Sequence, residues 1–566
     1  MSKNVKLELT WIGKNNDLSV EPRILVENTE LSNIKNDENT ENMLIHGDNL
    51  LALKALEQNY SGKIKCIYID PPYNTGSAFE HYDDNLEHST WLSLMKPRLE
   101  LLKNLLSEDG LIFVQIDDNE QAYLTVLMDE IFGRNNRLNT ICIKMSEASG
   151  VKMAHVDKRL PKLKEYILVY YKEKVPTITP EKVQVEKWNN EYKNIITGLN
   201  EDEIDELHIL INLDVANEIQ IERCNQILKK AKVLSLTEYF KLNKIEEKES
   251  EQWKFQHAKY IIQAVGSSSV FNIAKKTQLL SQDLMAVRSS TGLIYLIKTN
   301  FDINSKQPRV QIVFADENLL QNQGDLWLDI KTTGGVGQEG NVLFANSKKP
   351  EKLLKKIISM CTRPGDYVLD SFLGSGTTCA VAHKMNRKWI GVEMGDHAYT
   401  HAKKRLDSVI YGTDQTGISK VLNWSGGGGY KFYELAPTLI KEDDFGQTII
   451  NPEYNADMLA SAVAKHEGYF YNPDNTVFWK QSNNQGKSFL YVTTNHVNTQ
   501  LIETIKADMQ EDEFVLIVCK SFDSNCNSYK NIAIKKIPQS LLKNCEFGVD
   551  NYNLNIVCPP EYDEED

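Results

Sequence analysis

The sequence has little of what marks a secreted, membrane-bound or metal-bound protein. Its nine cysteines form no CxxC pair and no cluster with histidine at metal-ligand spacing, which predicts buried thiols, no disulfides and no metal. No apolar run approaches the roughly 20 residues of a membrane span. The N-terminus also lacks the apolar core of a secretory signal. We therefore expect a cytoplasmic protein with no membrane contact.

Proline, glycine and basic residues are also sparse. With 16 Pro, 30 Gly and 41% hydrophobic residues in 566, the composition excludes wholesale disorder and fibrous repeats. The 64 Lys and Arg stand against 78 Asp and Glu, a formal net charge of −14, which disfavours a nonspecific polyanion binder. A local cationic face remains open, because basic residues gather between Lys144 and Lys164.

Short apolar strands alternate with helices in two parts of the chain. The first part predicts strands at 43–46, 63–70, 111–117 and 165–171 and helices from Asn49, over 91–106 and over 120–132. The second predicts strands at 367–370 and 389–393 and helices over 351–360, from Thr377 and over 396–410. This alternation predicts a doubly wound α/β fold, with a mostly parallel sheet covered on both faces.

The alternation is interrupted, and the interruption divides the chain. Residues 1–175 and 321–412 are expected to form the two halves of one α/β domain. Residues 176–320 are polar, first helical in period and then strand-like, which predicts an inserted α+β domain. Residues 413–566 are expected to form a C-terminal α/β domain after a glycine run at 426–429 that marks a tight turn, a hinge or a linker.

A glycine-bearing turn follows the strand at 367–370. The segment from Asp370 through Phe372, Gly374 and Gly376 lets backbone approach a ligand at a helix N-terminus, and Glu393 ends the next strand, where a carboxylate can hold a ribose diol. This pattern predicts half of a nucleoside-cofactor site. ATP is excluded there, because the Lys-Ser or Lys-Thr pair of a phosphate loop is missing.

A second motif, Asp70-Pro71-Pro72-Tyr73, follows the apolar strand at 63–70. The amino group of a nucleobase is a poor nucleophile, because its lone pair is delocalised into the ring. The Asp70 carboxylate and the Pro71 carbonyl could accept its two N–H bonds and free that lone pair. The prolines stiffen the loop, and Tyr73 offers a stacking face to a base swung out of a duplex. A proline turn capped by Asp70 is the structural alternative.

These motifs resemble a known family. DPPYNTG (70–76) and DSFLGSGTT (370–378) resemble the amino-group DNA methyltransferases that use S-adenosylmethionine, in the permuted order called the beta class. The modification subunits of type III restriction systems share further segments with this chain. These are IHGDNLLALKAL (45–56), WLSLMKPRL (91–99), LIFVQIDDNE (111–120), EYILVYYK (165–172) and GVEMGDHAY (391–399). The resemblance implies a circularly permuted, seven-stranded, Rossmann-like sheet.

The resemblance also assigns roles to individual residues. It implies that Asp70, Pro71, Pro72 and Tyr73 form the catalytic loop, and it implies a cofactor site made of Asp48, Asp370, Phe372, Gly374, Gly376, Thr377 and Glu393. Asp48, Thr377 and Thr378 have helix capping as an alternative role. Lys348 and Lys349 lie where the family places its remaining cofactor-binding segment, and Ser371 stands where many relatives have proline.

The function implied is transfer of a methyl group to adenine N6 in a short sequence of double-stranded DNA, as a type III modification subunit. The insert would select the sequence, the chain would form a homodimer, and an ATP-dependent restriction subunit would dock after residue 413. Cytosine-N4 methylation and a recognition subunit with vestigial methylation are the alternatives. A small-molecule or RNA methyltransferase is disfavoured, because the insert is larger than a small substrate needs.

Overall fold

The computed structural model describes most of the chain, in two compact units. The described residues are 8–15, 20–74, 87–146, 160–185, 187–213, 215–304, 308–330, 336–344, 348–443 and 445–537, with Leu541 and Phe547. One unit comprises Met1–Thr179 and Gly324–Asp566, and the other comprises Pro180–Gln323. Within the described residues, no helix is both long and apolar enough to cross a membrane.

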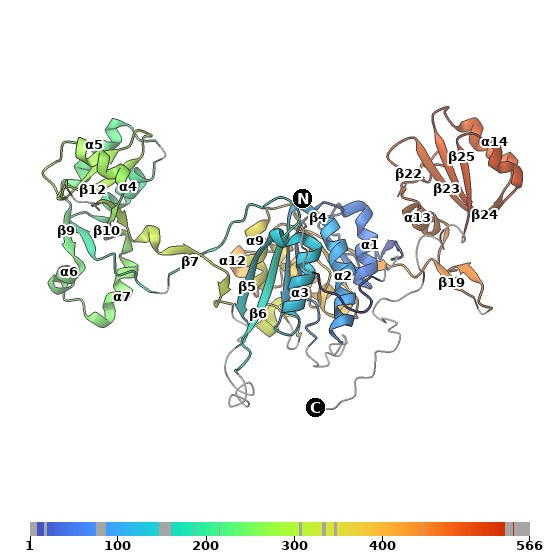
Figure 1. Cartoon of the computed structure of the whole chain (residues 1–566), viewed down its shortest axis with the longest axis horizontal. Coiled ribbons are helices and arrows are strands. Elements are labelled where there is room, and N and C mark those ends of the chain that lie inside the picture. The colour runs from blue at the N-terminus through green and yellow to red at the C-terminus, as the bar shows by residue number, and fades with distance from the viewer. Residues whose placement is uncertain are drawn as a thin grey trace. The chain divides into compact units, whose positions relative to one another are not determined.

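A ten-stranded sheet forms the centre of the first unit (Figure 1). In spatial order its strands are β1 (Leu25–Glu27), β18 (Lys431–Leu435), β2 (Met43–His46), β17 (Lys388–Glu393), β16 (Tyr367–Asp370), β3 (Ile64–Ile69), β4 (Leu106–Ile116), β6 (Lys164–Tyr171), β5 (Arg137–Lys144) and β15 (Leu326–Trp327). The run from β18 to β4 is parallel, whereas β6 is antiparallel to both neighbours. The seven strands from β2 to β5 match the number that the resemblance implies, although no strand was predicted at the position of β5, and the predicted fold class is confirmed.

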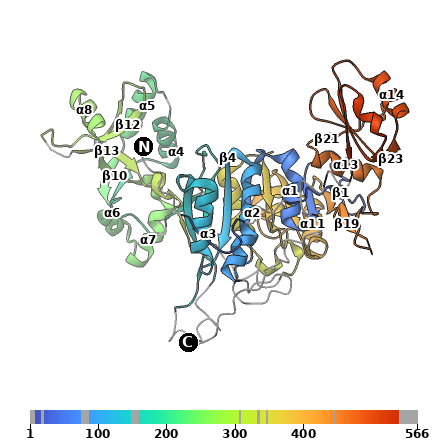
Figure 2. The same cartoon turned by 45° about the vertical axis from the view of Figure 1, so that its right-hand side comes forward.

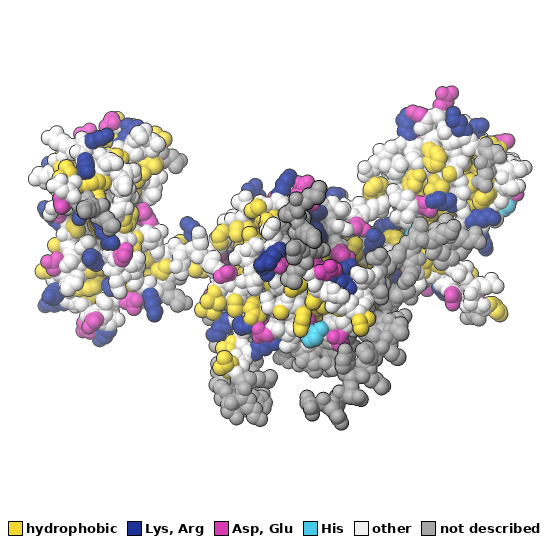
Figure 3. Space-filling model, viewed as in Figure 1, with side chains coloured by type: hydrophobic (Ala, Val, Ile, Leu, Met, Phe, Trp, Pro, Cys, Tyr) yellow, Lys and Arg dark blue, Asp and Glu magenta, His cyan; other side chains and the backbone are white. Residues whose placement is uncertain are grey.

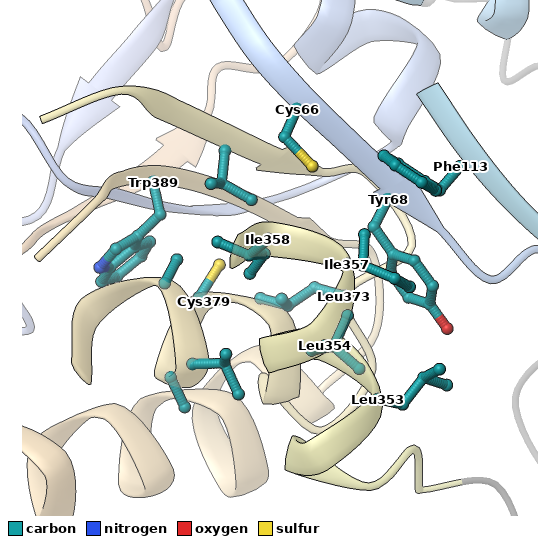
Figure 4. Close-up of a cluster of buried hydrophobic side chains, with 14 of the residues drawn as sticks. Cys66, Tyr68, Phe113, Leu353, Leu354, Ile357, Ile358, Leu373, Cys379 and Trp389 are labelled. Carbon is teal, nitrogen blue, oxygen red and sulfur yellow. The ribbon is translucent and has the colours of Figure 1, made fainter. Parts of the chain in front are cut away.

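Helices cover both faces of this sheet (Figure 2). One face packs against α1 (Asn49–Tyr60), α2 (His88–Leu105) and α3 (Gln121–Met128), and the other packs against α9 (Glu351–Cys361), α10 (Thr377–Lys384) and α11 (Lys403–Ile410). Side chains of a strand alternate between the two layers, so Ile67 joins the core beneath α1 and α2, whereas Cys66 and Tyr68 face α9 (Figure 4). This two-sided burial explains the continuous apolar strands.

The sheet extends beyond the predicted boundary at residue 412. β18 lies within the region predicted as the C-terminal domain, yet it pairs in parallel with β2 and covers that edge. The glycine run before it is a tightly packed turn. A Cβ at Gly428, whose φ is +75°, would lie 2.7 Å from the His383 ring, and a Cβ at Gly429 would lie 2.7 Å from the Asn33 carbonyl. Space therefore requires glycine at both positions, and the positive φ requires it at Gly428 as well.

The rest of the C-terminal region has its own small sheet. After α12 (Ser419–Leu422), the hairpin of β19 (Ile440–Glu442) and β20 (Thr448–Ile450) leads to a five-stranded sheet and two helices. These elements are α13 (Ala456–His466), β21 (Phe470–Tyr471), β22 (Ser482–Asn483), β23 (Ser488–Val497), α14 (Thr499–Asp508), β24 (Phe514–Phe522) and β25 (Ile532–Lys536). α13 packs on one face and α14 on the other.

The second unit is an α+β structure. Its six-stranded antiparallel sheet has the order β11 (Leu284–Arg288), β12 (Ile294–Lys298), β13 (Arg309–Phe314), β10 (Ile261–Gly266), β8 (Asn194–Thr197) and β9 (Lys232–Ser235). Its helices are α4 (Glu201–Ile211), α5 (Glu218–Leu228), α6 (Leu236–Asn243), α7 (Glu247–Gln256) and α8 (Ser268–Lys276). α4 and α5 cover one face and α8 the other, while β7 (Lys182–Gln184) pairs with β14 (Leu320–Asn322) where the chain enters and leaves.

Candidate active site

The predicted catalytic and cofactor motifs follow neighbouring parallel strands of the main sheet. β3 pairs with β16, and β16 pairs with β17. Asp70 directly follows β3, while Asp370 and Glu393 are the last residues of β16 and β17. Carboxyl ends of parallel strands form one edge of a sheet, which is where ligands bind in open α/β folds. Two motifs far apart in the sequence therefore meet at one edge.

Both carboxylate oxygens of Asp70 have a partner. Tyr73 Oη donates to Asp70 Oδ1 at 2.6 Å and lies 2.9 Å from Glu165 Oε2. Lys349 Nζ lies 2.8 Å from Asp70 Oδ2 and 5.0 Å from the centre of the Tyr73 ring. Burial raises the pKa of Asp70, against the opposing effect of Lys349 and Tyr73. Asp70 and Tyr73 thus lie together, whereas neither the pairing of Asp70 with Lys349 nor the part played by Glu165 was predicted from the sequence.

Glu165 belongs to a hydrogen-bonded group behind the catalytic loop. Gln115 Nε2 donates to Glu165 Oε2 at 2.5 Å, and Tyr68 Oη donates to Gln115 Oε1 at 2.6 Å. These residues lie on β6, β4 and β3, three adjacent strands. A glutamate and a glutamine in apolar strands, half-buried and buried respectively, are the sequence signal of such a group, because buried polar side chains need hydrogen-bond partners.

The loop itself is held from α2 and from the start of α3. Trp91 Nε1 donates to the Pro72 carbonyl at 2.8 Å, and Asn74 Nδ2 donates to Glu120 Oε1 at 2.7 Å. Asn74 has a φ of +56°, so the chain turns through a left-handed conformation directly after Tyr73. Pro71 is buried and Pro72 half-buried. These contacts place the backbone of the loop independently of a ligand.

The cofactor turn is ordered by its own carboxylate. Asp370 Oδ1 accepts from the Phe372 amide at 3.0 Å, and Asp370 Oδ2 accepts from Thr378 Oγ1 at 2.5 Å. Burial, with smaller contributions from Asp70 and Glu393, raises the pKa of Asp370 to about 7. Asp370 therefore stabilises the turn through hydrogen bonds to its own backbone and to the start of α10.

The two glycines of the turn differ in what surrounds them. Gly376, with φ +80°, lies so close to α11 that a Cβ there would be 3.1 Å from Ala402 Cα. At Gly374, with φ +54°, the nearest described atom to a Cβ would be Phe344 Cζ at 3.8 Å. A Cβ at Gly374 would thus make only an ordinary van der Waals contact with the described residues, so backbone conformation more than crowding calls for glycine there, and Phe372 is buried beside the turn.

Glu393 ties the turn to the next strand. It is buried, its Oε2 accepts from the Gly374 amide at 2.7 Å, and its Oε1 accepts from the Gly395 amide at 3.0 Å. A carboxylate has further lone pairs for a ribose diol. The glycine backbone at Gly374 and this fixed carboxylate fit the backbone and nucleoside contacts of S-adenosylmethionine.

Asp48 has the helix-capping contact that was its alternative role, whereas the hydroxyls of Thr377 and Thr378 bond to other side chains and do not cap α10. Asp48 accepts from the Leu51 amide at 3.0 Å as the N-cap of α1 and lies 3.3 Å from Arg98 Nη2. Thr377 accepts from Arg405 Nη1 at 2.6 Å, and Thr378 donates to Asp370. Their cofactor contacts remain predictions.

A buried group of charges lies behind the cofactor turn. Lys384 Nζ lies 2.9 Å from both Glu351 oxygens and 2.6 Å from Asp414 Oδ2, and Arg405 Nη2 lies 2.8 Å from Glu351 Oε1. All four side chains are fully buried. They fix the start of α9 against α10 and α11. Lys348, just before α9, donates to the Val342 carbonyl at 2.6 Å, and burial lowers its pKa to about 8.

The predicted basic run between Lys144 and Lys164 is only partly described. Lys162 lies 2.6 Å from Asp117 and Lys164 lies 2.6 Å from Asp118. Lys152, Lys158 and Arg159 lie outside the described residues. Two of the basic side chains are thus engaged in ion pairs on the sheet.

Comparison with known proteins identifies the class. The DNA methylase family matches residues 64–404, more than half of the chain, and the chain belongs to this family. The predicted family resemblance is thereby confirmed, and S-adenosylmethionine is the cofactor that this membership supports.

Two bacterial proteins are similar over most of the chain. The probable type III restriction-modification enzyme HindVI Mod subunit of Haemophilus influenzae is 36% identical over 70% of this chain and 54% of its own length. The type III restriction-modification enzyme EcoP15I Mod subunit of Escherichia coli is 25% identical over 80% of this chain and 74% of its own length. The chain thus spans about half the length of the HindVI relative.

One solved structure, the M1.HpyAVI–SAM complex, overlaps 64% of this chain and 99% of its own with 14% identity and a TM-score of 0.30. That overlap is too low to support an argument about the site.

Proposed function

We propose that the chain methylates adenine at N6 within a short DNA sequence, using S-adenosylmethionine. The observation that carries this proposal is the adjacency of β3 and β16, which sets the Asp70 loop beside the cofactor turn. A nucleoside cofactor held at Gly374 and Glu393 lies next to a loop suited to an aromatic amine. S-adenosylmethionine, when bound, supplies a methyl group already activated by its sulfonium.

The loop residues have separate tasks in this proposal. The ring of Tyr73 stacks on a base swung out of the duplex, and stiff prolines hold the Pro71 carbonyl and the Asp70 carboxylate toward its amino group. Two acceptors draw the nitrogen toward tetrahedral geometry and free its lone pair for the methyl group. Asp70 is also placed to take the proton that the nitrogen loses, because burial raises its pKa.

The unit at 180–323 is proposed to select the DNA sequence. Lys275, Lys276, Arg288, Lys298 and Arg309 lie on or beside its strands and α8, among Ser, Thr, Asn and Gln side chains suited to phosphates and base edges. Lys306 lies outside the described residues. On the face drawn in Figure 3, Lys and Arg side chains of this unit are scattered among hydrophobic side chains and carboxylates.

The assembly proposed is that of a type III modification subunit. The HindVI and EcoP15I relatives are both Mod subunits of type III restriction-modification enzymes, which supports the same role for this chain. In that role the protein acts in the cytoplasm as a homodimer, one copy reading the DNA while the other methylates. The region after residue 413 would then dock an ATP-dependent restriction subunit.

Single-molecule sequencing of host DNA, with and without the gene, tests this function. The proposal expects N6-methyladenine at one short sequence only in DNA from cells that carry the gene. Methylcytosine at N4 would reassign the target base, and no gene-dependent mark would favour a recognition subunit without methylation.

A further inference from the structure

Lys349 is the cation that faces the catalytic loop, and its position differs from that of its neighbour Lys348. Whereas Lys348 donates to backbone carbonyls, the Lys349 side chain reaches into the site and is only 11% exposed. Its ammonium lies 2.8 Å from Asp70 Oδ2 and 3.9 Å from Glu165 Oε2. It therefore lies between two carboxylates, bonded to one and just beyond hydrogen-bond range of the other.

The ion pair with Lys349 occupies Asp70 Oδ2, an oxygen of the carboxylate that would accept a hydrogen bond from the amino group of the base. Tyr73 Oη donates to Asp70 Oδ1 and Lys349 donates to Asp70 Oδ2, so an incoming amino group has to share an Asp70 oxygen with one of these donors or replace it. Displacing a buried ammonium without another partner would be costly. Glu165 provides that partner, because its Oε2, which accepts a hydrogen bond from Gln115, lies 3.9 Å from the Lys349 ammonium.

We propose that Lys349 is a positioning residue that pairs with Asp70 before the base enters and passes to Glu165 when the amino group takes its place at Asp70 Oδ2. No bond is made or broken in this exchange, since the ammonium keeps its proton and changes only its carboxylate partner. The inference rests on the proposed methyl transfer to an amino group and adds a residue that prepares the acceptor.

The backbone around Lys349 is suited to this task. Glu351, two residues on, is held by Lys384 and Arg405 in the buried charge group, and Lys348 is held by the Val342 carbonyl. The backbone is thus fixed on both sides of Lys349, and the flexible side chain alone has to move. The displacement required is small, because only the 3.9 Å distance to Glu165 must shorten to hydrogen-bond range.

The exchange predicts how Asp70 titrates. The groups that face Asp70 are Lys349 before α9, Tyr73 in the loop, Tyr68 on β3, Glu165 on β6 and Asp370 on β16. Lys349 lowers the pKa of Asp70, whereas Glu165 raises it. Loss of Lys349 should therefore raise the pH at which Asp70 becomes ionised, and loss of the Glu165 charge should lower it.

The test compares pH profiles of methylation by the full chain. Wild-type protein is assayed first on DNA that carries its site, so that absence of methylation there would count against the proposed function and not against Lys349. For Lys349→Met we expect the acid limb of the kcat/KM profile for DNA to move to higher pH, because this profile reports the free enzyme in which Lys349 pairs with Asp70, and we expect the loss of activity to be largest on the acid side. Lys349→Arg should restore part of the loss.

A second variant and a control complete the design. Glu165→Gln should lower the plateau of kcat, because Lys349 loses its second carboxylate partner, and should move the acid limb of the kcat/KM profile to lower pH, opposite in direction to Lys349→Met. Lys352→Met should leave the profile unchanged, because Lys352 is 52% exposed and pairs with Asp329. Calorimetry with S-adenosylmethionine checks that each variant is folded. A wild-type pH profile in Lys349→Met, or a loss that appears only as a higher KM for the cofactor, would overturn the inference.

Discussion

The Glu393 carboxylate accepts a 2.7 Å hydrogen bond from the Gly374 amide, which joins the end of β17 to the turn after β16. Glu393 therefore has two tasks, since it orders the glycine turn and presents its remaining lone pairs to a ribose. The two halves of the cofactor site are joined before any ligand arrives.

Replacing Glu393 tests the ribose assignment. Glu393→Ala should weaken S-adenosylmethionine binding by about 1 to 3 kcal/mol, the range for a lost hydrogen bond to a charged group. Calorimetry measures this loss, and wild-type binding should persist in EDTA. Glu100→Gln, which alters only an exposed pair with Lys96, is the matched control. Equal affinity for S-adenosylmethionine in Glu393→Ala and Glu100→Gln would show that Glu393 does not bind the cofactor.

Tyr73 variants separate the ring from the hydroxyl. We expect Tyr73→Phe to keep kcat within about tenfold of the wild type, since it loses one hydrogen bond to Asp70. Tyr73→Ala should lose more, because base stacking contributes roughly 1 to 3 kcal/mol. Steady-state methylation assays give both values. If the two variants are equally impaired, the hydroxyl matters more than stacking.

The buried charge group should be essential for stability. Lys384→Met leaves Glu351 and Asp414 short of a cation inside the protein, and breaking a buried pair in this way costs about 3 to 5 kcal/mol. Denaturant unfolding measures the difference. Lys352→Met removes an exposed pair and should cost less than about 1 kcal/mol. Similar losses in both variants would mean that the buried group is not a stabilising contact.

The same group predicts a dependence of stability on pH. Although burial opposes the change, the ion pairs with Arg405 and Lys384 lower the pKa of Glu351 from 4.5. A lowered pKa in the folded state stabilises the protein above the unfolded pKa, and this contribution is lost as the pH falls through the folded pKa. Lowering the pH below about 4.5 should therefore reduce the free energy of unfolding of the wild type more than that of Lys384→Met, as measured by denaturant unfolding. An identical acid dependence in both proteins would contradict this.

The sequence predicted the buried strands and both motifs, but not the contacts between them. β3 was predictable because it is apolar and mostly buried, whereas β5 was missed because it lies near the sheet edge and only two of its residues are buried. Asp70 was identified from its motif. Lys349 and Glu165 reach it from distant parts of the chain, and no local spacing encodes that contact.

Exchanging residues 180–323 tests the recognition role of this unit. The unit is compact, so the corresponding segment of a relative should fold in its place. We expect the methylated sequence to become that of the relative while the modified base stays the same, as read by single-molecule sequencing. A folded and active exchange protein that still marks its original sequence would place recognition elsewhere in the chain.

The most direct measurement of the central claim is the nucleoside product. Purified wild-type protein and Asp70→Ala are each incubated with S-adenosylmethionine and with DNA from host cells that lack the gene. The DNA is then digested to nucleosides and analysed by mass spectrometry. We predict N6-methyldeoxyadenosine with the wild type and none with Asp70→Ala, although both proteins bind cofactor and DNA. N4-methyldeoxycytidine as the product, or near-normal turnover by Asp70→Ala, would contradict the account.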